Sequence, residues 1–228
     1  MKIHNKCTAT LIDSMGNDLR VANAARVSFD KWKDEFDEKD AKLIRYLANP
    51  PDGKIHWAPF GHVMATMRLE MPIFTARQWI KSDKGCIRND NGVESEVSRR
   101  YVDSEPEFYI PDVFHARPEG GLKQGAGGVH EWSGQYVEWA VERAEDALDV
   151  YQTLIAEGMA PEEARMFLPQ NTMTTIIETG SLAYYARVFG LRTGSGAQGA
   201  VGQLAEEVGA IMQNIAPVCW QALTEKMA

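Results

Sequence analysis

A carboxylate, a hydroxyl group and two guanidinium groups occur together within residues 96–101, at Glu96, Ser98, Arg99 and Arg100. Adjacent arginines beside a serine are typical of an anion cradle. The planar guanidinium group matches the oxygens of a phosphate, and each charge-assisted hydrogen bond contributes about 1.5–3 kcal/mol. The alternative interpretation is a helix start that carries two arginines on its surface. The first interpretation predicts a site for a small anionic ligand.

The residues before this segment indicate a buried support for it. Residues 62–71 partly alternate between apolar and polar side chains, which predicts a strand. Pro72 is then expected to start a helix, because its missing N–H costs little in the first helical turn. That helix carries Gln78 and Trp79, close to the end of an apolar run. The strand and the helix would therefore position the polar cluster that follows them.

Helical periodicity is clearest in residues 132–157, with Gly158 as the C-cap and Pro161 opening the next helix. The other expected elements are a helix at 40–47, an edge strand at 108–111, a β-rich segment at 174–179, helices at 181–191 and 198–213, and mobile loops at 85–92 and 120–128. No repeat or linker divides the chain. Residues 1–228 are therefore predicted to form one mixed α/β domain, whose wide apolar helix faces favour oligomerisation.

The composition limits the classes of partner. Hydrophobic residues make up 44% of the chain, enough for a substantial core, and the 25% of charged residues is typical of globular proteins. The net charge of −8 argues against nonspecific binding of nucleic acid, which needs a broad basic surface. A small anion in a local arginine pocket remains compatible with that charge, because the local field attracts it.

The cysteines and the apolar runs argue for a cytoplasmic protein. Cys7, Cys86 and Cys219 are odd in number and widely spaced, so neither a disulfide framework nor a zinc site is indicated. The first residues lack the apolar core of a signal peptide, and no apolar run approaches the roughly 20 residues of a membrane span. We expect an enzyme or binding protein without a metal site or a membrane partner.

Four separated segments share their order and approximate spacing with one known family. They are residues 24–28, 56–62, 78–101 and 164–169, with Leu191-Arg192 and Ala197-Gln198 downstream. Together they resemble the flavin-dependent thymidylate synthases over most of residues 20–215. The Glu-x-Ser-x-Arg-Tyr pattern that ends the third segment is the most specific part of this resemblance.

The resemblance implies both an activity and an assembly. The protein would methylate dUMP to dTMP, with methylenetetrahydrofolate as carbon donor, FAD as hydride carrier and NADPH as reductant of the flavin. The fold would be α/β (α+β), a mainly antiparallel sheet flanked by long helices in a single domain. The family forms a homotetramer whose active sites are built from several subunits.

The resemblance also assigns residues to the nucleotide. The positions that match the dUMP site are Gln78, Lys81, Glu96, Ser98, Arg99, Arg100, Arg165 and Arg192. Arg100 and Arg165 would hold the phosphate, and Arg192 and Ser98 would be the catalytic residues. A fixed cation beside a pyrimidine carbonyl stabilises the negative charge that builds as C5 becomes nucleophilic, so no enzyme nucleophile is required. The alternatives are a helix-surface role for Arg165 and a helix-end role for Arg192.

The flavin side departs from the family pattern. The matching positions are Ser28, His56, Arg88, Glu96, Ser181 and Gln198. Ser181 stands where asparagine is usual, and the Arg-His-Arg that opens the family signature is absent. This chain has roughly seven extra residues around 85–92, and Lys81, Lys84 or Arg88 could supply the missing charge.

Three other functions remain open. The first is a flavin enzyme that makes a modified uracil nucleotide. The second is ordinary thymidylate synthase chemistry with Cys86 as the nucleophile, since Lys84 and Arg88 flank it and would lower the pKa of a thiol. The third is a degenerate homologue that binds nucleotides without turnover, which the departures on the flavin side suggest.

Overall fold

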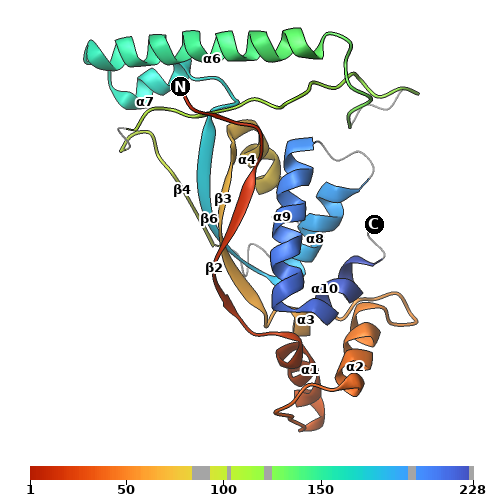
Figure 1. The fold of residues 1–228 in the computed structure, drawn as a ribbon. Helices are drawn as coiled ribbons and strands as arrows, with labels where there is room; N and C mark the ends of the chain where they lie inside the picture. Colours follow the sequence, from red (N-terminus) through yellow and green to blue (C-terminus); the bar gives the residue numbers. More distant parts are fainter. Residues whose placement is uncertain (84–92, 102–103, 121–124, 195–198, 226–228) are drawn as a thin grey trace.

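The computed structural model describes residues 1–83, 93–101, 104–120, 125–194 and 199–225 (Figure 1). The loop predicted at 85–92 lies outside the described residues, as does part of the loop predicted at 120–128. Within the described part of the chain, no helix is long and apolar enough to cross a membrane.

A four-stranded antiparallel sheet forms the centre of the fold, with strand order β2-β3-β6-β4. The strands are β2 (Thr8–Met15), β3 (Met64–Pro72), β6 (Met173–Ser181) and β4 (Val93–Glu96). The strand predicted at 62–71 and the β-rich segment at 174–179 are therefore confirmed, as is the mainly antiparallel sheet. β2 and β4 were not predicted.

Alternation along the two central strands separates the faces of this sheet. Ala65, Met67 and Leu69 of β3 are buried, and Arg68 between them is exposed. Ile176 of β6 is likewise buried, whereas its neighbour Ile177 is 45% exposed. Because successive side chains of a strand point to opposite faces, one face carries the core and the other is open.

Helices cover the buried face (Figure 1). They are α4 (Ile73–Ile80), α8 (Leu182–Thr193), α9 (Gly199–Ile215) and α10 (Pro217–Thr224). The helix expected after Pro72 and those expected at 181–191 and 198–213 are confirmed. α10 was not predicted, although Pro217 lies at its start and Cys219 and Trp220 are buried in the core.

Several helices lie at one end of the sheet (Figure 1). The longest of them, α2 (Glu38–Ala48), confirms the helix predicted at 40–47. The others are α1 (Asp18–Arg26), the 3₁₀ turn η1 (Val27–Phe29) and α3 (Trp57–Phe60). α2 begins with a capping box, in which the side chains of Asp37 and Asp40 each accept the other residue's backbone N–H.

The long helix α6 (Ser133–Ala156) crosses the opposite end (Figure 1). It is followed by α7 (Pro161–Ala164) and η3 (Arg165–Phe167). β1 (Ile3–His4) pairs in parallel with β5 (Phe108–Tyr109) beside α6. Ala144 and Leu148 of α6 pack against Phe108 and Ile110, whereas Trp139 is half exposed. Only part of the predicted apolar stripe of α6 is therefore buried.

Gly180 in β6 gives a first prediction, because a side chain there would enter the core. A Cβ atom at this position would overlap the ring of Tyr184 and lie 3.1 Å from Cε2 of Tyr185, both fully buried. Gly180→Ala is expected to lower the free energy of unfolding by about 1–3 kcal/mol, as overpacked cores do. Gly134→Ala is the control, since nothing lies within 4 Å of a Cβ atom there. Urea unfolding of both variants tests this, and equal stabilities would contradict it.

Candidate functional site

The polar segment at 96–101 leaves the edge of the sheet at the end of β4. The N–H of Val97 still donates to the carbonyl of Thr175 at 2.9 Å, and the N–H of Tyr101 then donates to the carbonyl of Ser98 at 3.0 Å. The chain therefore turns after a strand, and the alternative of a helix start is wrong. This geometry places the polar side chains where the edge strand ends.

The turn opens onto a cavity of about 330 Å³, which we call the cradle cavity. Five of the residues predicted to bind dUMP line it, namely Glu96, Ser98, Arg99, Arg100 and Arg165. Arg165 comes from η3, and Ile73 and Thr174 mark the starts of α4 and β6 in the same wall. Residues far apart in the sequence thus meet at one cavity.

Two cations at the cradle cavity, Arg100 and Arg165, form hydrogen bonds but have no carboxylate partner in the part of the chain that the structure describes. Nε of Arg100 donates to Oγ of Ser98 at 3.1 Å, and Nε of Arg165 donates to the carbonyl of Glu162 at 3.1 Å. Among the described residues, no carboxylate forms an ion pair with either arginine. Oε1 of Glu96 accepts the hydroxyl of Thr174 at 2.8 Å, which fixes that carboxylate on the sheet. The arrangement suits an anion with several oxygens.

Arg192 lies near the C-terminal end of α8, half-buried, and two acceptors fix its guanidinium group. Nε donates to Oγ of Ser82 at 2.9 Å, and Nη2 donates to the carbonyl of Gln78 at 2.6 Å. Burial lowers the pKa of Arg192, and the nearby Tyr184 opposes this shift. Arg192 therefore binds a carbonyl in the last turn of a helix, as the helix-end alternative predicted, but that helix is α4 and not its own helix α8.

Gln78 and Lys81 are close to Arg192 in the chain's structure but do not line the cradle cavity. Gln78 is half-buried on α4, and Lys81 is exposed at the start of η2 (Lys81–Asp83). α4 links the two places, because Ile73 at its start lines the cradle cavity. From Ile73 to Gln78 the helix rises about 8 Å.

The predicted flavin residues lie elsewhere in the chain. Ser28 in η1 and His56 before α3 are exposed, and His56 stacks on Tyr46 with ring centroids 6.1 Å apart. Ser181 is fully buried, and its Oγ accepts the N–H of Tyr184 at 3.2 Å as the N-cap of α8. Arg88 and Gln198 lie outside the described residues. The exposed hydroxyl of Ser28 and the imidazole of His56 are groups that can contact a flavin.

These flavin-side residues are distant from the cradle cavity within one chain. Thr174 lines the cavity near one end of β6, and Ser181 lies at the other end. Seven residues of extended strand span about 23 Å. Glu96, which was predicted to approach both ligands, is the one described flavin candidate that lies at the cradle.

Two residues at these sites escaped the sequence analysis. Thr174, which donates to Glu96, begins a β-rich segment, and alternation along that strand would have placed it on the same face as buried Ile176. Ser82, which accepts from Arg192, is buried in η2 only because that turn folds against α8. No sequence signal identifies Ser82.

The described cysteines do not resemble a thiolate nucleophile. Burial raises the pKa of Cys7 to about 12, and it also raises the pKa of Cys219. Both are buried and free of disulfides. Cys86, which was the candidate for covalent catalysis, lies outside the described residues.

The fold and the cradle cavity together define an α/β protein with an arginine-lined cavity at the edge of an antiparallel sheet. Its sequence is similar to those of a known protein family. The family model described as "Thymidylate synthase complementing protein" matches residues 10–218. The flavin-dependent thymidylate synthase of Thermosipho melanesiensis is 34% identical over 219 residues, 95% of this chain and 90% of that protein. That of Thermus thermophilus is 30% identical, over 95% of this chain and 75% of that protein.

Solved structures of one further protein share this fold. The UMP/dUMP methylase PolB from Streptomyces cacaoi, bound with 5-Br dUMP, matches with a TM-score of 0.84 and 28% identity, over 99% of this chain and 97% of that chain. The same protein bound with 5-Br UMP matches with a TM-score of 0.82. This chain belongs to the family of flavin-dependent thymidylate synthases, as its resemblance predicted. It is an enzyme of the methyltransferase class.

Proposed function

We propose that this enzyme methylates dUMP reductively to dTMP, with methylenetetrahydrofolate as carbon donor, FAD as hydride carrier and NADPH as reductant. The observation that carries the nucleotide part is the cradle cavity, where Arg100 and Arg165 face one space without a described carboxylate partner. A phosphate monoester is a dianion near neutral pH, and two guanidinium forks complement it.

The chain's own residues divide the work on dUMP. Arg100 and Arg165 hold the phosphate, and Ser98 orients Arg100 through its hydroxyl group. Arg192 lies against the uracil ring, where its fixed charge stabilises the negative charge that develops as C5 becomes nucleophilic. Gln78 and Ser82 hold that guanidinium group in place before the reaction begins. No covalent bond from a cysteine is required.

The flavin would be held by Ser28, His56 and Glu96, together with Arg88 and Gln198. Ser181 is fully buried as the N-cap of α8, so its hydroxyl would support the end of β6 rather than contact the flavin. When bound, FAD supplies the hydride that completes the methyl group. Glu96 connects the two ligands, because its carboxylate is fixed by Thr174 at the wall of the cradle cavity.

We also propose a cytoplasmic homotetramer of one-domain subunits, with active sites shared between them. The distance of about 23 Å along β6 supports this, because Ser181 is too far from Thr174 for one chain to place both ligands together. The open sheet face and the half-exposed Trp139 of α6 offer surfaces for a second copy. Light scattering of the purified protein tests the number of subunits.

Anaerobic turnover is the direct test of the reaction. The purified enzyme is incubated with dUMP, methylenetetrahydrofolate, FAD and NADPH, and the product is identified by mass spectrometry. We expect dTMP, and its formation should require FAD. Failure to form dTMP or to take up FAD would leave the degenerate, nucleotide-binding alternative.

Arg165→Gln gives a second test that needs no turnover. Loss of one charge-assisted contact worth about 1.5–3 kcal/mol is expected to raise the Kd for dUMP about 10–100-fold. Calorimetric titration with dUMP measures this. Arg143→Gln on α6 is the matched control, because Arg143 is exposed and pairs with Asp146 far from the cavity lining. An unchanged Kd for Arg165→Gln would contradict the proposed phosphate contact.

A second candidate is methylation of a related uracil nucleotide. The solved structures of PolB hold both 5-Br dUMP and 5-Br UMP, and PolB is described as a UMP/dUMP methylase. Comparing kcat/KM for UMP and dUMP distinguishes the two candidates. A preference for dUMP supports thymidylate synthesis, and a preference for UMP supports the alternative of a modified uracil nucleotide.

A further inference from the structure

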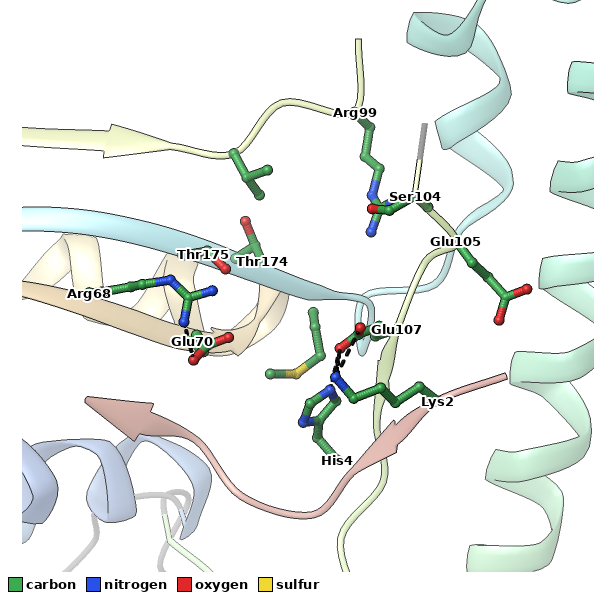
Figure 2. A pocket seen from close by; sticks show the side chains of 12 residues that line it. Lys2, His4, Arg68, Glu70, Arg99, Ser104, Glu105, Glu107, Thr174 and Thr175 are labelled. Carbon is green, nitrogen blue, oxygen red and sulfur yellow. Dashed lines mark hydrogen bonds and ion pairs between the residues drawn. The ribbon is translucent and has the colours of Figure 1, made fainter. Parts of the chain in front are cut away.

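A second cavity, of about 270 Å³, is shown in Figure 2, and it adjoins the cradle cavity. The two share part of their walls, namely Val97, Arg99, Met173 and Thr174. The rest of the second cavity comes from the N-terminal segment, from the open face of β3 and from residues 104–107. A ligand here would therefore lie next to a nucleotide in the cradle cavity, because the two cavities share these walls.

The carboxylates around this second cavity already have partners. Glu70 pairs with Arg68 at 2.5 Å, and Glu107 pairs with Lys2 at 3.0 Å and with His4. Burial raises the pKa of Glu107, but the hydrogen bonds from His4 and Lys2 outweigh this, so its pKa lies below the ordinary value. Glu70 and Glu107 therefore have cationic partners within the wall of the cavity (Figure 2).

Arg99 differs from the other cations of this wall. Its Nη1 donates to the carbonyl of Ser104, and no ion pair joins it to a carboxylate among the described residues. The side chain extends from the turn toward Ser104, at the side of the cavity opposite Lys2 and His4 (Figure 2). Burial lowers the pKa of Arg99, because the half-buried charge has lost water, and the nearby charges of Tyr151 and Glu107 offset this only in part. A guanidinium group has five donors, and the carbonyl uses one of them.

We propose that the second cavity binds an anionic group, a carboxylate or a phosphate, of a substrate other than the nucleotide, with Arg99 as its main ligand. The fork of Arg99 matches either group, and the hydroxyl of Thr175 lines the same space. The volume is below the 300–1,000 Å³ that is typical of sites for a whole small ligand, so the cavity suits one end of a larger molecule.

The identity of that molecule rests on the proposed function. Of the substrates named there, the folate carries glutamate carboxylates at its end, and NADPH carries a phosphate that NADH lacks. The site itself rests on the cavity and on Arg99, and it can be tested without turnover.

The experiment measures binding of two probes, γ-linked triglutamate and inorganic phosphate, by calorimetry on the full-length protein. Saturating dUMP is present throughout, so that the cradle cavity is filled and neither probe can bind there. Arg99→Gln is compared with Arg165→Gln, because Arg165 lines the cradle cavity but not the second cavity. At least one probe is expected to bind the wild-type protein and Arg165→Gln alike, and to bind Arg99→Gln about tenfold or more weakly. Arg99→Lys, which keeps the charge without the fork, should bind it with intermediate affinity.

Each outcome has a definite meaning. Triglutamate binding that depends on Arg99 supports a carboxylate end, and phosphate binding with the same dependence supports a phosphate end. The proposal is overturned if neither probe binds the wild-type protein, if Arg99→Gln and Arg99→Lys bind as well as wild type, or if Arg165→Gln loses the binding. dUMP titrated in parallel reports on the proposed function separately, since its affinity should depend on Arg165.

Discussion

Replacing Arg192 by alanine is expected to lower kcat for dUMP methylation by about 10²–10³-fold, the usual effect of removing a fixed donor from developing negative charge. The Kd for dUMP should change much less, because the contact strengthens only as charge builds on the ring. Steady-state kinetics and dUMP titration of the variant measure the two quantities. A variant with normal kcat would contradict the role assigned to Arg192.

Two further variants separate the charge of Arg192 from its placement. Arg192→Lys keeps a cation, but a single ammonium group cannot reproduce the planar pair of bonds to Ser82 and Gln78. Ser82→Ala keeps the guanidinium group and removes one of its two acceptors. Both are expected to retain more activity than Arg192→Ala, and Ser82→Ala should lower kcat without weakening dUMP binding. Equal losses in all three variants, with loss of thermal stability, would indicate a structural role instead.

Asp40→Ala is expected to have the largest effect on stability, about 3–5 kcal/mol, because it breaks a buried ion pair from one side. Asp40 is fully buried and pairs with Arg26 and with Nζ of Lys33, the latter at 2.9 Å. Its carboxylate also accepts the N–H of Asp37 at 2.8 Å. The side chain of Arg26 is only 15% exposed, so its charge would remain buried without a partner.

The control for this prediction is an ion pair on the surface. Asp146→Ala removes a carboxylate that pairs with Arg143 on α6, where both side chains are mostly exposed. Exposed pairs contribute about 0–1 kcal/mol, so this variant should unfold close to wild type in urea. If the two aspartate variants lose similar stability, the network around Asp40 has no special role in holding α1 against α2.

Local patterns in the sequence were sufficient to predict many of the helices and strands. The alternation through 62–71 predicted β3, and Pro72 marked the start of α4 correctly. The stripe through 132–157 predicted α6, because a helix of that length shows its period clearly. β2 was missed because its side chains are mostly exposed, which leaves no regular hydrophobic pattern to detect.

The site was predicted in part, and the limits have physical reasons. The charges at 96–101 predicted an anion cradle, and the structure places Glu96, Ser98, Arg99 and Arg100 around one cavity. The sequence could not separate Arg99 from Arg100, because the turn after β4 decides that one side chain bonds Ser98 and the other extends toward Ser104. The contacts of Arg192 depend on packing between helices distant in sequence, which no local pattern reports.

The pairing of β3 with β6 also has a consequence for how the enzyme is made. Thr66 and Thr179 share a hydrogen bond at 2.9 Å although 113 residues separate them along the chain. Pairings of this kind close late in folding, since the entropy of a long loop must be overcome before the contact forms. The bond from Thr174 to Glu96, and the pairing of β4, the strand before the turn with Arg100, both depend on β6 being in place. A nascent chain on the ribosome therefore cannot form the cradle cavity before β6, which ends at residue 181, has been made.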